Sequence, residues 1–423
     1  MNLAERDKKV IWHPYTQMKN PLPHVPIVRG EGVYLFDETG KKYIDAVSSW
    51  WVNIHGHAHP HIAEKVSAQL QLLEHVIFAG FTHEPAVQLA ERLLPLLPGT
   101  QEKVFYTDNG STAVEVALKM CLQYWANTTK QPRKKILAFK EAYHGDTFGA
   151  MSVSGRSIFT DPFSSLLFEV EFIDLPNEKN ISQIKSRINY LSNEVACFIF
   201  EPLVLGAGGM LMYDAVYLDE LIATCQQQGI LTVADEVMTG FGRTGRLFSC
   251  EILQNKPDIF CLSKGLTGGT MPLGVTTCNT KVFEAFLSDD KLKTLYHGHS
   301  FTANPVACAA ALASMDILLS PETLPNIQRV TARHTEFAMK IKGHPKLKDV
   351  RQTGTILVME WATGDDTSYL NKLRNQLYNY FLARGIILRP LGNILYILPP
   401  YVISDADLDY IYSTILTALE DIN

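Results

Sequence analysis

The chain has 423 residues, of which 46% are hydrophobic and 19% charged, a balance typical of a folded protein with a large apolar core. A formal net charge of -6 gives no general attraction for nucleic acid or an anionic membrane, so we expect small-molecule chemistry. The seven scattered cysteines and a charged start without an apolar stretch argue against a disulfide framework and a secretory signal, and they favour a cytoplasmic location.

The first fifty residues are expected to form loops and short strands that pack with a small domain. The proline-punctuated stretch 11–16 predicts an extended arm. The stretches 32–37 and 42–47 predict a hairpin. Two adjacent tryptophans, Trp50 and Trp51, cannot both face one core from a strand, so we expect at least one of them to line a cleft or an interface.

Four histidines alternate between positions 55 and 61, a pattern that raises the question of a metal site. Pro60 fits the first turn of a helix predicted over 62–73, which would take part of the tract out of the strand-like alternation. We therefore expect no metal site in this tract.

A strand predicted at 104–107 runs into a polar turn, and a helix with one apolar face follows. Free N–H groups and the positive end of the helix dipole would make the turn at Gly110 and Ser111 a phosphate site. Ordinary helix capping by Asn109 or Ser111 explains the same residues and stays open as an alternative.

Further apolar runs near residues 136, 197, 230 and 258 alternate with helical stretches. They predict an α/β fold with a mostly parallel sheet and helices on both faces. We expect this large domain to span 51–310, and a smaller α+β domain to span 311–423 and pack with 1–50. Tyr143 follows the strand near 136, where its ring could lie flat against a cofactor.

Two of these strands end in residues that suggest one chemistry. The strand near 230 ends at Asp235, and the strand near 258 ends at Lys264 before a glycine-rich turn. A lysine at the carboxyl edge of such a sheet can attack a carbonyl, and a buried aspartate can keep a pyridine nitrogen protonated. The pair predicts a pyridoxal phosphate enzyme, with a solvated lysine and a capping aspartate as the plainer alternatives.

Two other motifs suggest ligand binding, each with a plainer alternative. Gly240 to Gly245 formally matches the dinucleotide fingerprint, but four residues separate it from the preceding strand, so nicotinamide binding is the weaker interpretation. Arg389 follows an apolar stretch and could grip a substrate carboxylate, or form a surface salt bridge instead.

The stretch 235–245, followed by Ser263-Lys264-Gly265, resembles the signature of the class III aminotransferases, which are pyridoxal phosphate enzymes of fold type I. The resemblance covers essentially the whole chain. It implies catalytic roles for Lys264, Asp235 and Tyr143. It implies that the cofactor is bound by Gly110, Ser111, Tyr143, Asp235, Lys264, His299 and Ser300. It implies that the substrate is bound by Tyr15, Trp50, Tyr143, Lys264, Gly298 and Arg389.

Within that class, the segments 12–16, 48–51, 143–152 and 389–396 resemble members that act in biotin synthesis. This likeness implies amino transfer from S-adenosylmethionine to 8-amino-7-oxononanoate in a homodimer whose Ser300 reaches the neighbouring subunit's phosphate. Two residues depart from the pattern of that family: His299 stands where proline or another residue is expected, and Leu205 stands where glutamine is common. Lysine as the donor, another class III transaminase, and an aminomutase or racemase on the same fold remain alternatives.

Overall fold

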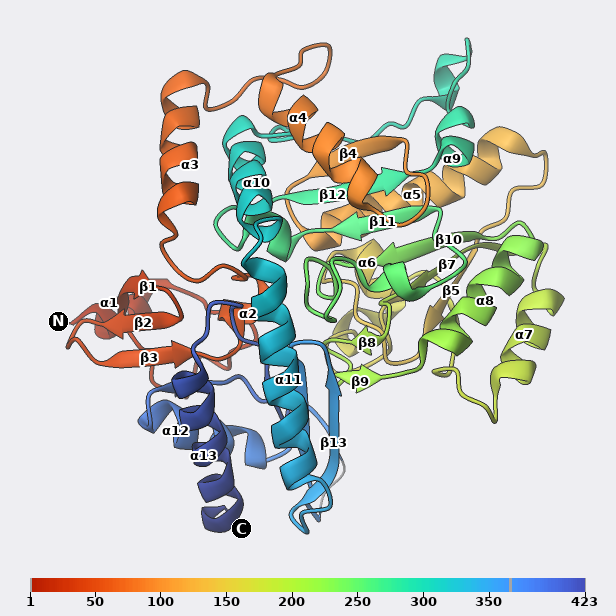
Figure 1. Ribbon diagram of the computed structural model, residues 1–423. Coiled ribbons are helices and arrows are strands. Elements are labelled where there is room, and N and C mark those ends of the chain that lie inside the picture. The colour runs from red at the N-terminus through yellow and green to blue at the C-terminus, as the bar shows by residue number, and fades with distance from the viewer. Residues whose placement is uncertain (1, 365–366, 423) are drawn as a thin grey trace.

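The computed structural model describes residues 2–364 and 367–422 (Figure 1). A seven-stranded sheet forms the larger part of the molecule. In spatial order its strands are β4 (Lys103–Thr107), β12 (Gly274–Cys278), β11 (Ile259–Leu262), β10 (Leu231–Asp235), β7 (Val195–Phe200), β5 (Lys135–Phe139) and β6 (Glu171–Ile173). From β11 to β6 every neighbouring pair is parallel, whereas β12 is antiparallel to both of its neighbours. The predicted mostly parallel α/β fold is confirmed, although β12 was not foreseen.

Helices cover both faces of this sheet because successive strand residues point to opposite sides. In β5, Ile136 and Ala138 pack in one core cluster, while Leu137 and Phe139 pack in another. The helices of the first layer are α5 (Gly110–Thr128), α6 (Phe148–Val153) and α9 (Thr280–Glu284). The helices of the second layer are α4 (Glu84–Leu93), α7 (Ile181–Tyr190), α8 (Ala215–Gln227) and α10 (Pro305–Leu318).

A smaller α+β part forms the lower region of Figure 1. Its antiparallel sheet consists of β13 (Leu347–Thr353), β14 (Ile356–Trp361) and β16 (Ile394–Ile397). Its helices are α11 (Thr323–Ile341), α12 (Leu373–Ala383) and α13 (Asp405–Asp421). Apolar residues of these helices and strands share one core cluster, which is separate from the clusters on the large sheet.

The N-terminal segment pairs with this smaller part. Its elements are α1 (Leu3–Val10), β1 (Ile27–Glu31), β2 (Tyr34–Asp37) and β3 (Lys42–Asp45). Strands β2 and β3 form the predicted hairpin, and β3 also pairs in parallel with β15 (Ile386–Ile387). Helix α10 runs across position 310, so that predicted domain boundary falls inside a helix. The domain division stays a prediction, and its outer limits, 1 and 423, lie outside the described residues.

The remaining elements are short, apart from the 13-residue helix α3. They are α2 (Ser48–Trp51), α3 (Pro60–Leu72), β8 (Val204–Leu205), β9 (Leu211–Met212), η1 (Leu94–Leu96), η2 (Asp161–Leu166), η3 (Ser249–Ile252), η4 (Lys264–Thr267) and η5 (Lys291–Lys293). All four residues of α2 have a positive φ, between +48° and +88°. A left-handed turn of non-glycine residues is costly, so the surrounding packing must hold it in place.

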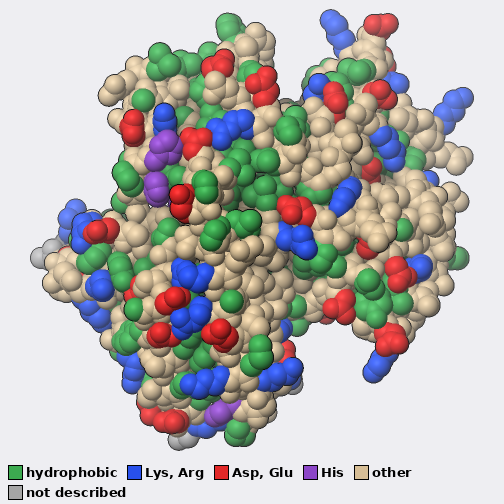
Figure 2. Space-filling model, viewed as in Figure 1, with side chains coloured by type: hydrophobic (Ala, Val, Ile, Leu, Met, Phe, Trp, Pro, Cys, Tyr) green, Lys and Arg blue, Asp and Glu red, His purple; other side chains and the backbone are tan. Residues whose placement is uncertain are grey.

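Charged side chains of both signs mix on the face shown in Figure 2, over the lower region where α11 and α13 lie side by side. Arg329 and Arg333 of α11 both pair with Asp405 of α13, at 2.7 and 3.3 Å.

Within the described residues, no single helix has the length and apolar character needed to cross a membrane, and only the bent pair of α10 and α11 meets those criteria jointly.

Candidate active site

Lys264 stands where strand β11 ends, at the carboxyl edge of the large sheet. The preceding Ser263 donates a hydrogen bond to the Leu273 carbonyl oxygen (2.7 Å), which fixes the strand end. Lys264 itself has a φ of +48°, and its Nζ lies 4.5 Å from the centroid of the Trp51 ring. Burial lowers the pKa of Lys264 to about 8, although the Asp235 and Glu201 carboxylates act in the opposite direction. A larger share of this amine is therefore neutral, and so nucleophilic, than in a solvated lysine.

Asp235 is the last residue of β10 and is buried beside His144. Oδ2 of Asp235 lies 2.7 Å from Nδ1 of His144, and Oδ1 accepts from the Val237 backbone N–H at 3.1 Å. The buried carboxylate therefore has donors that stabilise its charge. Among the described residues, Nε2 of His144 is buried without a partner.

Glu201, directly after β7, ties two loops together at the same edge. It accepts hydrogen bonds from the backbone N–H groups of Tyr143 and Gly206, both at 2.9 Å. Burial raises the pKa of Glu201 to about 7, and the nearby Asp235 adds to the increase. This carboxyl group thus ties the Tyr143 backbone to the loop at Gly206.

The N-terminus of α5 faces the same space. Asn109 caps the helix by accepting from the Thr112 backbone N–H (3.0 Å), so the capping alternative describes Asn109 correctly. In the described part of the chain, the N–H groups of Gly110 and Ser111 have no hydrogen-bond partner. Ser111 Oγ accepts from the Asp146 N–H at 3.3 Å. Two free donors and the dipole of a 19-residue helix therefore remain available to an anion.

One cavity of about 630 Å³ joins these groups. The predicted site residues that line it are Tyr15, Trp50, Gly110, Ser111, Tyr143, Asp235, Lys264 and Arg389. They come from the N-terminal segment, the large sheet and the C-terminal part. The structure thus brings together in one chain eight of the residues that sequence patterns and resemblance singled out.

Aromatic rings form one wall of this cavity. The Tyr15 and Trp50 rings are 5.4 Å apart, and the Tyr15 hydroxyl lies 3.2 Å from that of Tyr143 and also donates to Asp146. Burial raises the pKa of Tyr15 to about 12. The Arg389 guanidinium carbon lies 4.2 Å from the centroid of the Trp50 ring. Trp50 is 36% exposed and Trp51 is 4% exposed, and both line the cavity, so the expectation that at least one tryptophan lines a cleft is confirmed.

Three predicted residues lie elsewhere within the chain. Gly298 and Ser300 are exposed, and neither they nor His299 line the cavity that holds Lys264. His299 Nδ1 accepts from the Phe301 N–H at 3.2 Å, and His299 N–H donates to Thr302. A role for this segment in the same chain's cavity finds no support in the geometry.

The histidine tract does not converge on one point in the described structure. His55 contacts Ser314, His57 contacts Asp45 and His61 contacts Asp316, each at 2.9 Å. Ser314 and Asp316 both lie on α10, whereas Asp45 ends β3, and each imidazole contacts a different one of these side chains. Leu205, the other departure, is buried in β8 and contributes only apolar surface.

The glycine-rich stretch 240–245 does not form a dinucleotide-binding turn. The next helical element after β10 is the short η3, which begins at Ser249, so no helix N-terminus follows these glycines directly. Arg243 is buried and donates to the carbonyl oxygens of Pro399 (2.9 Å) and Trp51 (3.3 Å). The stretch therefore supports Trp51 at the cavity, and the nicotinamide alternative is not supported.

Sequence reasoning assigned no role to His144, Glu201, Trp51 or Arg243. Glu201 carries a usable signal, because it ends an apolar strand as Asp235 does. His144 and Arg243 carry none, since their partners Asp235 and Pro399 lie 91 and 156 residues away.

The residues present fit pyridoxal phosphate. The cavity offers a buried primary amine of lowered pKa, a buried carboxylate with a histidine partner, and unpaired N–H groups at a helix N-terminus. At Gly145 (φ +128°) an added Cβ would stand 2.0 Å from Ser111 Oγ, so only glycine leaves that hydroxyl its place. These are the groups that an aldehyde, a pyridine nitrogen and a phosphate require.

Comparisons with known proteins agree with this fit. The model of the family "Aminotransferase class-III" matches residues 15–419. An adenosylmethionine-8-amino-7-oxononanoate aminotransferase of Synechococcus elongatus is 47% identical, and the match covers 97% of this chain and 99% of that protein. The crystal structure of the enzyme of that name from Methanocaldococcus jannaschii has a TM-score of 0.95 and 36% identity, over 99% of this chain and 98% of that one.

An amine transaminase from an uncultivated Pseudomonas species, solved in its PLP-bound form, has a TM-score of 0.90 and 29% identity, over 98% of this chain and 99% of that one. The fold and the fit of the cavity are thus those of a family with known cofactor use. The chain belongs to the class III aminotransferases and is a pyridoxal phosphate-dependent enzyme.

Proposed function

We propose that this enzyme transfers the amino group of S-adenosylmethionine to 8-amino-7-oxononanoate and so makes 7,8-diaminononanoate for biotin synthesis. The observation that carries the proposal is similarity along the whole chain, at 34–47% identity, to eight relatives that share one name for this reaction. The presence of Tyr15, Trp50 and Arg389 in the cavity of Lys264 supports it.

We assign the cofactor to residues of the cavity. Lys264 would hold its aldehyde carbon, Asp235 its ring nitrogen, Tyr143 the face of its ring, and Gly110 with Ser111 its phosphate. When bound, pyridoxal phosphate supplies an electron sink for the carbon that loses a proton. His144 is a positioning residue here, because its contact at 2.7 Å holds the Asp235 carboxylate in place.

Lys264 would also move the proton. An amine with a pKa near 8 is about one-tenth neutral at pH 7, against less than about 0.1% for an ordinary lysine. Its Nζ can therefore take a proton from the substrate carbon and return it at neutral pH. Both substrates react at the same Lys264 amine, so the first product must leave before the second substrate binds. The reaction is therefore ping-pong.

Substrate recognition would fall to the aromatic wall and Arg389. The guanidinium lies against the Trp50 ring, and its fork of N–H donors suits the carboxylate of 8-amino-7-oxononanoate. The pair of Tyr15 and Trp50, 5.4 Å apart, leaves an apolar side for the chain of that substrate. Tyr143 closes the wall through its contact with the Tyr15 hydroxyl.

We also propose a homodimer, with Gly298, His299 and Ser300 completing the neighbouring subunit's site at its phosphate and substrate sides. Their segment is exposed and away from its own cavity, as a residue that serves another subunit must be. Light scattering should give a mass about twice 47.4 kDa for the homodimer.

The free thiols of all seven cysteines fit a reducing cytoplasm.

The deciding experiment is an amino-transfer assay with 8-amino-7-oxononanoate and one donor at a time. S-adenosylmethionine should support formation of 7,8-diaminononanoate, whereas lysine, acetylornithine and an ω-amino acid should not. Turnover with lysine alone would replace the donor but keep the acceptor. Turnover of a single amino compound without an acceptor would indicate a mutase or racemase and would contradict the proposal.

A further inference from the structure

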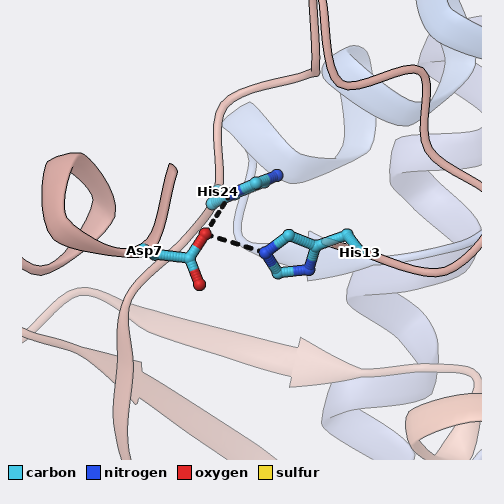
Figure 3. A group of neighbouring side chains, drawn as sticks. All are labelled: Asp7, His13 and His24. Carbon is cyan, nitrogen blue, oxygen red and sulfur yellow. Dashed lines mark hydrogen bonds and ion pairs between the residues drawn. The ribbon is translucent and has the colours of Figure 1, made fainter. Parts of the chain in front are cut away.

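Asp7, His13 and His24 meet at one point outside the active-site cavity (Figure 3). Asp7 lies on α1, His13 follows in the extended arm, and His24 comes from a proline-flanked stretch ahead of β1. Oδ2 of Asp7 is 2.7 Å from Nε2 of His13 and 2.8 Å from Nδ1 of His24. All three ligand atoms lie within 4.8 Å of one another.

We propose that Asp7, His13 and His24 form a binding site for a divalent transition-metal ion, with zinc as the best match, which ties the N-terminal arm to α1. Two imidazole nitrogens and one carboxylate oxygen are a donor set that suits zinc and its neighbours. One carboxylate with two imidazoles is a poor set for calcium or magnesium, which require mostly oxygen ligands.

The distances leave room for an ion after a small movement. Ligand atoms at about 2.0–2.1 Å from a tetrahedral zinc lie about 3.3 Å from each other. The present separations of 2.7 and 2.8 Å from the Asp7 oxygen therefore need to open by about half an ångström. Side chains that are 22–31% exposed and carried by the arm and a loop can make that adjustment.

Access and charge also favour an ion. His13 and His24 line a cavity of about 450 Å³, from which water can complete the coordination. Arg374 lines the same cavity, but its Nη2 donates to the Tyr369 hydroxyl at 3.2 Å and its guanidinium stacks on that ring. That cation is thus directed toward another partner.

The site has a consequence for the arm. Tyr15 comes two residues after His13 and lies in the active-site cavity, against Trp50 and Tyr143. An ion that holds His13 to α1 restricts the backbone immediately before Tyr15. The metal is thus structural, and its effect is expected on the stability of the N-terminal segment.

Untagged holoenzyme, stripped of metal by a chelator and then freed of it, should be titrated with zinc chloride by calorimetry. The wild-type chain should bind one equivalent with a raised melting temperature. Because loss of a partner that merely supports a ligand weakens metal binding 10–100-fold, loss of a ligand in His24→Ala or Asp7→Asn should weaken it by at least about 100-fold. X-ray absorption should show only nitrogen and oxygen ligands.

His61→Ala is the matched control, because His61 is also partly exposed and also contacts one carboxylate, at 2.9 Å. It should bind zinc as the wild type does. Circular dichroism and metal-free melting curves identify any variant that is unfolded. Asp7→Asn and His24→Ala each remove a different ligand, so each variant tests the site independently of the other. Absence of saturable binding in the wild type, or binding in both ligand variants as tight as in the wild type, would show that the three side chains form hydrogen bonds only.

Discussion

At the scale of the residue, we propose that Lys264 decides the chemistry. We expect Lys264→Ala to lower kcat at least about 100-fold, because general acid–base catalysis alone contributes that much. After borohydride reduction, mass spectrometry should find the cofactor attached at position 264 in the wild type and absent there in the variant. Lys135 lies on β5 and pairs with Glu194. The control variant Lys135→Ala should leave both readouts unchanged. Full turnover by Lys264→Ala would exclude the assigned role.

The lowered pKa of Lys264 has a second observable effect. In the cofactor-free protein, acylation of Lys264 should show a midpoint near pH 8. The Lys135 amine, whose pKa is raised by its hydrogen bond with Glu194, should titrate above 10.5. Because the folded pKa of Lys264 lies below its unfolded value, the unfolded chain binds more protons than the folded chain between about pH 8 and 10.5. The contribution of Lys264 to the free energy of unfolding therefore rises with pH across that window. Equal midpoints for both lysines would contradict the burial argument.

At the scale of the element, the turn before α6 depends on Gly145. Gly145→Ala should cost about 1–2 kcal/mol for its backbone conformation, and about 1–3 kcal/mol more because the new Cβ displaces Ser111 Oγ. Pyridoxal phosphate should bind the variant more weakly. Gly40→Ala is the control: its φ is +84°, but nothing lies within 4 Å of the new Cβ. The two free energies of unfolding and cofactor affinities can be compared directly, and equal losses in both variants would refute the clash.

At the scale of the whole molecule, the segment 298–300 should act across subunits. Lys264→Ala and Ser300→Asp should each be inactive alone, the second because its charge repels a phosphate. In the proposed homodimer, co-expression in equal amounts should make half of the dimers mixed, each with one intact site, so about one-quarter of wild-type activity should return. Restored activity requires Ser300 to serve the neighbouring site. No recovery in purified mixed dimers would place Ser300 in its own chain's site, and full activity of Ser300→Asp alone would place it outside the site.

Local sequence was sufficient for the parts of the site that follow directly from a strand or begin a helix. Asp235, Lys264 and Gly110 each adjoin an apolar run, and the carboxyl ends of parallel strands share one edge. That rule led to the sheet, to the amine and carboxylate pair, and to the helix N-terminus, all of which line one cavity. The resemblance of longer motifs then supplied Tyr15. It also gave substrate roles to Trp50 and Arg389, which the adjacent tryptophans and the apolar stretch before Arg389 had already marked as candidates.

Contacts between distant segments were decided only by the tertiary structure. His144 meets Asp235 across 91 residues, and the left-handed turn of α2 carries both Trp50 and Trp51, which line the cavity. Asp7, His13 and His24 meet because α1, the arm and the loop before β1 fold back on one another. The physical reason is that strand ends and helix starts depend on neighbours in the chain, whereas these pairings depend on how the sheet edge and the N-terminal segment pack in space.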